Sequence, residues 1–174
     1  MKMCGFLKRS LFFVKDANTI VSIYNTIVRS TTSYACLLWN PQHQYLINEL
    51  ERVQRNLVRY ICYKTGLERD DFSYEELCKK FHIPTLSQFR QSISLVFFYN
   101  LIHGKIKCPE LLNRISVFIP PVATRSGMLF GEPKVRTDYK RRMWHFTLPK
   151  YCNIHKLNPF MSFSQWKKAI SDCI

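Results

Sequence analysis

Apolar side chains recur at every third or fourth position over long stretches of this chain, and that spacing predicts α-helices. Residues 17–39 follow the pattern, although their many β-branched side chains would also suit a strand. Residues 43–63 follow it more regularly, with one apolar stripe on the side opposite to Arg52, Arg55 and Arg59. The stripe consists of Leu46, Ile47, Leu50, Val53, Leu57 and Ile61. The pattern therefore predicts two helices in the N-terminal part of the chain.

Polar residues mark where the predicted helices begin and end. Asp16 can cap the first helix, which has to end before Pro41. Three residue pairs at the spacing i, i+3 have the composition of a capping box, in which each side chain bonds to the other residue's backbone N–H. These pairs are Ser73 with Glu76, Thr85 with Gln88, and Ser162 with Gln165. The helix that begins near Thr85 is expected to run to His103 and to stop at Gly104.

The character of the sequence changes along the chain, and this change predicts its organisation. Residues 95–102 are apolar nearly all round, so they should lie at the centre of the core. After Ile115 the periodicity is largely lost and prolines become frequent. We therefore expect an all-α fold, a bundle of about four to five helices followed by an irregular basic segment and a C-terminal helix. The expected parts are a basic lead-in over residues 1–16, a helical body over 17–115, a basic Pro-containing segment over 116–156 and the C-terminal helix over 157–174.

The charge of the chain bears on its partners rather than on its fold. The 174 residues include 26 Lys+Arg against 12 Asp+Glu, a formal net charge of +14. Residues 114–156 alone hold nine basic side chains against two acidic ones, which is half of that surplus. A phosphate backbone, an anionic membrane surface or an acidic protein would each complement it. Nucleic acid is the commonest partner of so basic a chain, so we expect RNA or DNA backbone as the partner.

Composition narrows the class of protein further. Hydrophobic residues make up 47% of the chain and aromatic residues 14%, which excludes a disordered polypeptide. The most apolar run, residues 93–102, is too short to span a bilayer, so no membrane is expected as partner. The seven cysteines are scattered and contain no CxxC, which fits free thiols in a reducing compartment. An intracellular location, in the nucleus or the cytoplasm, is therefore expected.

Patterns for catalysis or metal binding are weak. Two-metal phosphoryl transfer needs clustered carboxylates, and the adjacent pair Asp70–Asp71 sits in a polar turn. No nucleotide-binding, hydrolase or metalloprotease motif is present. The one knuckle-like metal pair is Cys152 with His155, whose further ligands the fold would have to supply, and buried free cysteines are the ordinary alternative. We expect no enzyme, no cofactor and no small-molecule substrate.

Residues 134–146, with the sequence KVRTDYKRRMWHF, interleave cations with aromatic rings. Cations neutralise phosphates, and aromatic faces stack on unpaired bases. The alternative interpretation buries Trp144 and Phe146 in the core and leaves the charges in solvent. The arginine row of residues 52–59 can also track phosphates, unless Glu49 and Glu51 neutralise it. The candidate nucleic-acid-binding residues are Arg52, Arg55, Arg59, Lys134, Arg136, Tyr139, Lys140, Arg141, Arg142 and Trp144.

Two blocks of the sequence, taken in order, resemble a known family. The first runs Tyr34-Ala35, Trp39-x-Pro41 and Leu50-Glu51-Arg52-Val53-Gln54-Arg55, and the second runs Gly104, Cys108-Pro109 and Leu111-Leu112. Their order and spacing resemble the region after the polymerase domain in reverse transcriptases of jockey-type non-LTR retrotransposons (LINE-like elements). The resemblance covers residues 5–172.

The resemblance implies a helical thumb and C-terminal extension that grip a template–primer or the element RNA. One departure is Ser33, where the family usually has Glu. The palm aspartates of the family are absent from this sequence, so a non-catalytic, nucleic-acid-binding remnant of a decayed element is expected. One alternative is a helical protein-interaction module that once packed on the missing reverse-transcriptase palm domain. Another is a mitochondrial or membrane-surface protein, because residues 1–15 are basic and free of acidic side chains.

Overall fold

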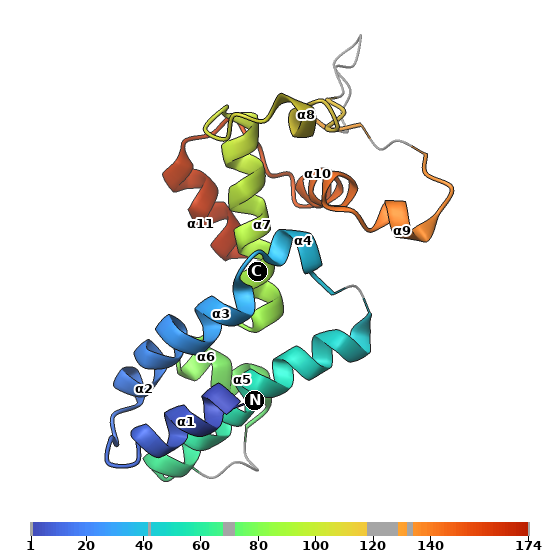
Figure 1. Cartoon of the computed structure of the whole chain (residues 1–174). Coiled ribbons are helices and arrows are strands. Elements are labelled where there is room, and N and C mark those ends of the chain that lie inside the picture. Colours follow the sequence, from blue (N-terminus) through green and yellow to red (C-terminus); the bar gives the residue numbers. More distant parts are fainter. Residues whose placement is uncertain (1, 42, 68–71, 118–128, 132–133, 174) are drawn as a thin grey trace. The chain divides into compact units, whose positions relative to one another are not determined.

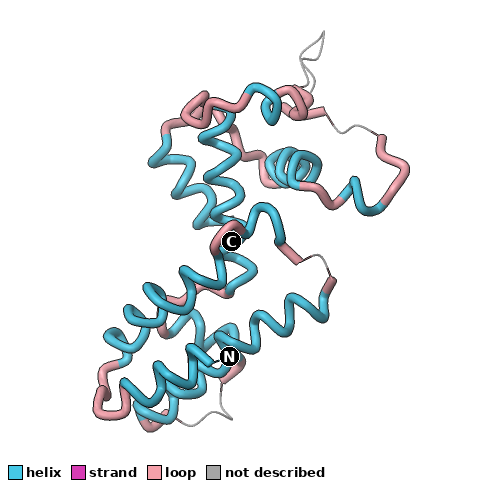
Figure 2. Tube along the Cα trace, in the orientation of Figure 1, coloured by secondary structure: helices cyan, strands magenta, loops and turns pink. Residues whose placement is uncertain are grey.

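Helices make up the regular structure of this protein wherever it is described (Figure 2). The computed structural model describes residues 2–41, 43–67, 72–117, 129–131 and 134–173. Among these residues, β pairing is limited to one isolated antiparallel bridge between Val117 and Phe130. The predicted all-α fold is confirmed.

The chain divides into two units, residues 1–90 and residues 91–174, and the division falls within one long helix, α7 (Figure 1). The change of sequence character after Ile115 lies inside the second unit. Unit 1 contains α1 (Lys2–Ser10), α2 (Ala17–Tyr24), the π-helical η1 (Asn25–Arg29), α3 (Ser30–Ser33), α4 (Cys36–Trp39), α5 (Gln44–Thr65), α6 (Tyr74–Lys80) and the start of α7 (Leu86–Ile102). Unit 2 contains the rest of α7, α8 (Pro109–Leu112), α9 (Asp138–Arg141), α10 (Trp144–Ile154) and α11 (Phe163–Cys173).

Residues 2–10 form the helix α1, which packs in unit 1, and this is more structure than a basic lead-in implies. Leu7 and Leu11 are buried in the same apolar cluster as Leu57 and other core residues of α2 and α5. The hydroxyl of Tyr60 on α5 donates to the backbone oxygens of Lys8 at 3.2 Å and Leu11 at 3.0 Å. The bond to Lys8 satisfies a carbonyl group of the last turn of α1, where the helix itself supplies no donor.

The helix predicted over residues 17–39 is not continuous. α2 passes into the π-helical turn η1, and α3 ends before Ala35, which has a left-handed φ of +50°. Ser and Thr hydroxyls along this stretch bond back to carbonyls one turn earlier; Ser30 donates to Thr26 and Thr31 donates to Ile27. Such bonds compete with the regular helical ladder and bend it. The many β-branched and hydroxyl residues of this stretch therefore show in the structure as interruptions of a helix.

The buried side of α5 differs in part from the predicted apolar stripe. Leu57 and Ile61 are buried as expected, whereas Leu46 near the start of the helix is 39% exposed. Glu51 and Gln54 are buried on the same helix. Polar side chains are buried where partners satisfy them, and apolar spacing does not reveal those partners.

Gln54 joins α2, α5 and the turn before α7 through polar contacts. Its amide Nε2 donates to the carbonyl oxygen of Pro84 at 3.0 Å, and its Oε1 accepts from the hydroxyl of Tyr24 at 3.2 Å. Arg29 donates to the same Pro84 oxygen at 3.1 Å, and its guanidinium carbon lies 3.8 Å from the centre of the Phe89 ring. These contacts allow polar side chains to lie inside unit 1.

The predicted helix starts and stop are confirmed. Asp16 accepts from the backbone N–H groups of Asn18 and Thr19 at the start of α2. Reciprocal bonds of 2.8 to 3.5 Å form in the three predicted boxes, Ser73 with Glu76, Thr85 with Gln88, and Ser162 with Gln165. Gly104 follows α7 with a φ of +65°, the conformation that a helix-ending glycine supplies.

The core of unit 2 forms around the C-terminal part of α7, as the apolar stretch of residues 95–102 predicts. Leu95 and Phe98 are fully buried there, and α10 and α11 contribute Cys152 and Trp166 to the same cluster. Figure 1 shows the course of these three helices. The indole N–H of Trp166 donates to the backbone oxygen of Leu95 at 3.3 Å. Trp166 therefore fixes α11 to α7 through both packing and a hydrogen bond.

The segment over residues 116–156 is irregular only in part, because it contains α9 and the 11-residue helix α10. Pro149 lies inside α10, where proline removes one backbone hydrogen bond. Leu148 and Cys152 on either side of it are buried in the core of unit 2. Burial of the apolar face of α10 therefore outweighs the tendency of proline to break a helix.

Candidate nucleic-acid interface

The predicted arginine row lies exposed along α5. Arg52, Arg55 and Arg59 follow one another at one-turn spacing, away from the buried Leu57 and Ile61. Arg52 approaches a carboxylate, and its Nη1 lies 3.5 Å from Glu49, while both side chains stay more than 60% exposed. An exposed pair of this kind contributes about 0–1 kcal/mol, so a phosphate can replace it.

Glu51 does not neutralise this row. Its carboxylate accepts from the hydroxyl of Tyr74 at 2.8 Å and from the backbone N–H groups of Leu86 at 3.3 Å and Ser87 at 2.8 Å. It is 6% exposed and caps the start of α7. Of the two carboxylates that could have neutralised the arginine row, only Glu49 faces solvent beside it.

Arg55 is held against an aromatic ring. Its guanidinium carbon lies 5.1 Å from the centre of the Tyr74 ring, so α6 supports the middle of the arginine row. Among the described residues no carboxylate pairs with Arg55 or with Arg59. Of the three arginines of the row, Arg52 alone is paired with a carboxylate, that of Glu49, among the described residues.

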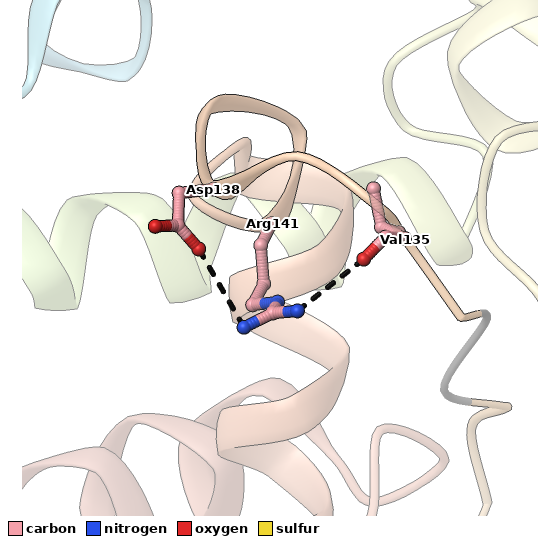
Figure 3. Close-up of polar contacts among 3 residues, drawn as sticks. All are labelled: Val135, Asp138 and Arg141. Atoms are coloured by element: carbon pink, nitrogen blue, oxygen red, sulfur yellow. Dashed lines mark hydrogen bonds and ion pairs between the residues drawn. The ribbon is translucent and has the colours of Figure 1, made fainter.

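The basic segment of unit 2 places its cations in solvent around the single turn of α9. Nη1 of Arg141 lies 3.6 Å from Asp138, and Nη2 donates to the backbone oxygen of Val135 at 3.3 Å (Figure 3). These two contacts fold Arg141 back over its own turn. The segment's other cations, Lys134, Arg136, Lys140 and Arg142, are exposed as well.

Among the aromatic side chains of the expected interleaving, Trp144 packs on the core. Trp144 is half-buried against the core of unit 2, and its ring meets that of Phe97 edge to face at 5.7 Å. Phe146 is half-buried and lies 4.3 Å from the ring of His145. Burial and the nearby Arg114 lower the pKa of His145, which therefore adds no charge at neutral pH. The alternative interpretation, in which the aromatic rings pack on the core, therefore fits Trp144. The cations of the segment stay exposed and can contact phosphates. The side chain of Tyr139 lies outside the described part.

The arginine row belongs to unit 1 and residues 134–146 to unit 2, so the two sets of candidates form separate surfaces. Unit 1 has 13 Lys and Arg residues against 8 Asp and Glu residues, a surplus of 5. Unit 2 has 13 against 4, a surplus of 9. The larger part of the positive charge lies in unit 2, which holds residues 134–146.

Cys152 and His155, the pair that could begin a zinc site, differ in burial, since Cys152 is buried and His155 is exposed. Cys152 is 1% exposed, and burial raises the pKa of its thiol to about 12, so it stays protonated at neutral pH. His155 is exposed and its ring packs 4.0 Å from that of Tyr151. No group of three or more metal-ligating side chains occurs in the part of the chain that is described, and Asp70–Asp71 lie outside it.

Sequence reasoning did not single out Lys8 and Lys64, which the structure brings to one aromatic ring. Their Nζ atoms lie 5.7 and 5.6 Å from the centre of the Tyr60 ring. The available signal is the absence of acidic residues from positions 1–15 and 52–67. The absence of acidic residues does not predict that α1 packs on α5, because that contact depends on the tertiary fold.

Comparisons with known proteins leave the family of this chain open. No family model, no curated protein and no solved structure matches it. Among the described residues, no helix combines the length and the apolar character that crossing a bilayer needs.

Proposed function

We propose that this chain binds nucleic acid through its exposed cations and catalyses no reaction itself. The observation that carries the proposal is the poor neutralisation of the predicted contact residues. Six of the eight candidate cations have no carboxylate partner among the described residues, and the pairs of Arg52 and Arg141 are exposed ones. Cations in this state bind phosphates with release of counterions, which is the main source of affinity for polyanions.

The order of sequence blocks supports a more specific proposal. The chain is related to the C-terminal, post-palm region of jockey-type non-LTR reverse transcriptases, whose role would be to hold RNA or a template–primer. The Leu50–Arg55 block lies on α5, with Glu51 and Gln54 in polar contacts of unit 1 and the two arginines in solvent. A protein of this kind would act in the nucleus or the cytoplasm.

The experiment is a titration of the full chain with RNA and DNA oligonucleotides at several salt concentrations. The dissociation constant should rise steeply with salt, with a logarithmic slope of about 0.7–0.9 for each phosphate contact. Arg141→Ala with Arg142→Ala should lower that slope by about 1–2 and weaken binding to all sequences alike. Lys167→Ala with Lys168→Ala removes the same charge from α11 and should have the smaller effect. Binding that ignores salt would refute the proposal.

A second candidate function rests on a group of exposed apolar side chains in unit 1. Tyr34 is 79% exposed, Leu38 88% and Tyr45 65%, and they lie on or between α3, α4 and the start of α5. Exposed apolar groups of this size are typical of protein contacts. The partner would be a reverse-transcriptase palm domain, and the module would then self-associate on size-exclusion chromatography whether or not RNA is present.

A further inference from the structure

The turn after α1 presents two phenylalanine rings to solvent. Phe12 is 65% exposed and Phe13 is 90% exposed, and their rings meet edge to face at 5.3 Å. Side chains of this size gain free energy when they leave water, so an adjacent exposed pair is a feature that calls for a ligand.

The turn is held by α5 rather than left free. The Tyr60 hydroxyl binds the backbone oxygens of Lys8 and Leu11, and the ammonium of Lys64 donates to the backbone oxygen of Phe12. Leu11 itself is buried in the unit 1 core. The backbone of the turn that carries Phe12 and Phe13 is thus held before any ligand arrives, which reduces the entropy lost on binding.

Cations flank the pair, and among the described residues no carboxylate is paired with them. Nζ of Lys64 lies 4.7 Å from the centre of the Phe12 ring. Residues 1–15 and 52–67, which include α1 and most of α5, contain no Asp or Glu. The next acidic residue along the chain, Asp16, is engaged as the cap of α2 and hydrogen-bonds to Thr19. Lys8, Arg9, Lys15 and Lys64 therefore have no carboxylate partner in the described structure.

We infer that Phe12 and Phe13 form a platform for unpaired bases, with the surrounding lysines and arginine on the adjacent phosphates. Aromatic faces stack on any base, and flanking cations follow the backbone, which is how proteins hold single strands without reading sequence. The inference rests on the proposed function and adds to it a ligand class, single-stranded RNA or DNA, and a place in unit 1.

Lys64 is placed to serve a bound strand. Its ammonium group lies 4.7 Å from the centre of the Phe12 ring. A base stacked on the pair leaves that ammonium in water, where it can meet the adjacent phosphate. An anionic lipid surface also attracts exposed phenylalanine and lysine side chains, so lipid vesicles serve as the rival ligand in the test.

The test compares the full wild-type chain with the variant Phe12→Ala plus Phe13→Ala on three ligands. These are a single strand of about 12 nucleotides, an abasic strand with the same number of phosphates, and a blunt duplex of that length. Wild type should bind the base-containing strand on the order of tenfold more tightly than the abasic strand. The variant should bind both equally, at the wild-type level for the abasic strand, and should keep its affinity for the duplex.

Phe160→Ala is the matched control, because it removes a phenylalanine that is 68% exposed in unit 2. It should leave all three affinities unchanged. Circular dichroism should show that the variants fold, since neither Phe12 nor Phe13 is buried.

The outcomes separate this inference from the proposed function. If wild type binds none of the three ligands in dilute buffer, the proposed function and the platform both fail. If wild type binds all three with steep salt dependence but does not distinguish the abasic strand, the platform alone is refuted. A parallel titration with phosphatidylserine vesicles tests the lipid alternative. If the variant loses vesicle binding that wild type shows and both proteins keep the preference for bases, the pair belongs to a membrane contact and the inference is overturned.

Discussion

At the scale of single residues, the state of each charged side chain depends on whether the fold supplies partners. Glu51 and Arg52 are neighbours in the sequence, yet Glu51 is buried and caps α7 while Arg52 stays in solvent. A helix turns by 100° per residue, so adjacent side chains face different surroundings. The exposed face of α5 is therefore more cationic than the helix as a whole, since Glu51 is buried among polar partners inside unit 1.

Replacing Glu51 by Ala should destabilise unit 1 by about 3 kcal/mol. The substitution leaves the hydroxyl of Tyr74 and the N–H groups of Leu86 and Ser87 without their acceptor. Urea denaturation followed by circular dichroism measures the change. Glu49→Ala is the control, since it breaks an exposed pair and should alter the free energy of unfolding by about 0.5 kcal/mol or less. Equal effects of the two substitutions would contradict the assigned role of Glu51.

At the scale of helices, capping residues set the boundaries and side-chain hydroxyls set the interruptions. The capping boxes that begin α6, α7 and α11 follow from local chemistry, so the sequence predicted them. The break between α3 and α4 was not predicted, because Ala35 has no local preference for the left-handed conformation that it adopts. Burial of Cys36 and the bond from the Trp39 indole to the Tyr34 oxygen hold the chain there.

Ala35→Gly should stabilise the protein by about 0.5–1 kcal/mol. Glycine adopts a φ of +50° without the contact that alanine's Cβ makes there, and this gain exceeds the added freedom of the unfolded chain. Thermal denaturation would show a raised midpoint. Ala169→Gly in the middle of α11 serves as the opposite control and should lower stability by about 1 kcal/mol. A lower midpoint for Ala35→Gly would mean that the break between the helices is not formed in solution.

At the scale of the whole molecule, the formal charge of +14 is spread over both units, with the larger surplus in unit 2. Like charges at this density repel one another and disfavour the folded state, and a bound polyanion relieves that repulsion. Residues 134–146 contribute both to stability and to this charge. Trp144 packs on the core, while Arg141 and Arg142 face water.

Inorganic polyphosphate should therefore raise the melting temperature of the chain at low salt. At a concentration of about 100 times the dissociation constant the linkage contributes about 2.7 kcal/mol, which corresponds to a shift of about 5–10 °C for a chain of this size. Differential scanning fluorimetry measures the shift, and about 0.5 M NaCl should abolish it. Polylysine should have no effect. A melting temperature that polyphosphate leaves unchanged would argue against any polyanion site.

The sequence by itself determined the helical class, the starts of α2, α6, α7 and α11, the stop at Gly104 and the excess of cation. These features depend on hydrogen bonds and periodicities within a few residues, which the order of amino acids specifies directly. Only the tertiary structure decided that α1 packs on α5, that Glu51 is buried and that Trp144 lies against Phe97. Each of these depends on a partner distant in the chain, and burial of a polar or aromatic side chain is favourable or unfavourable according to that partner.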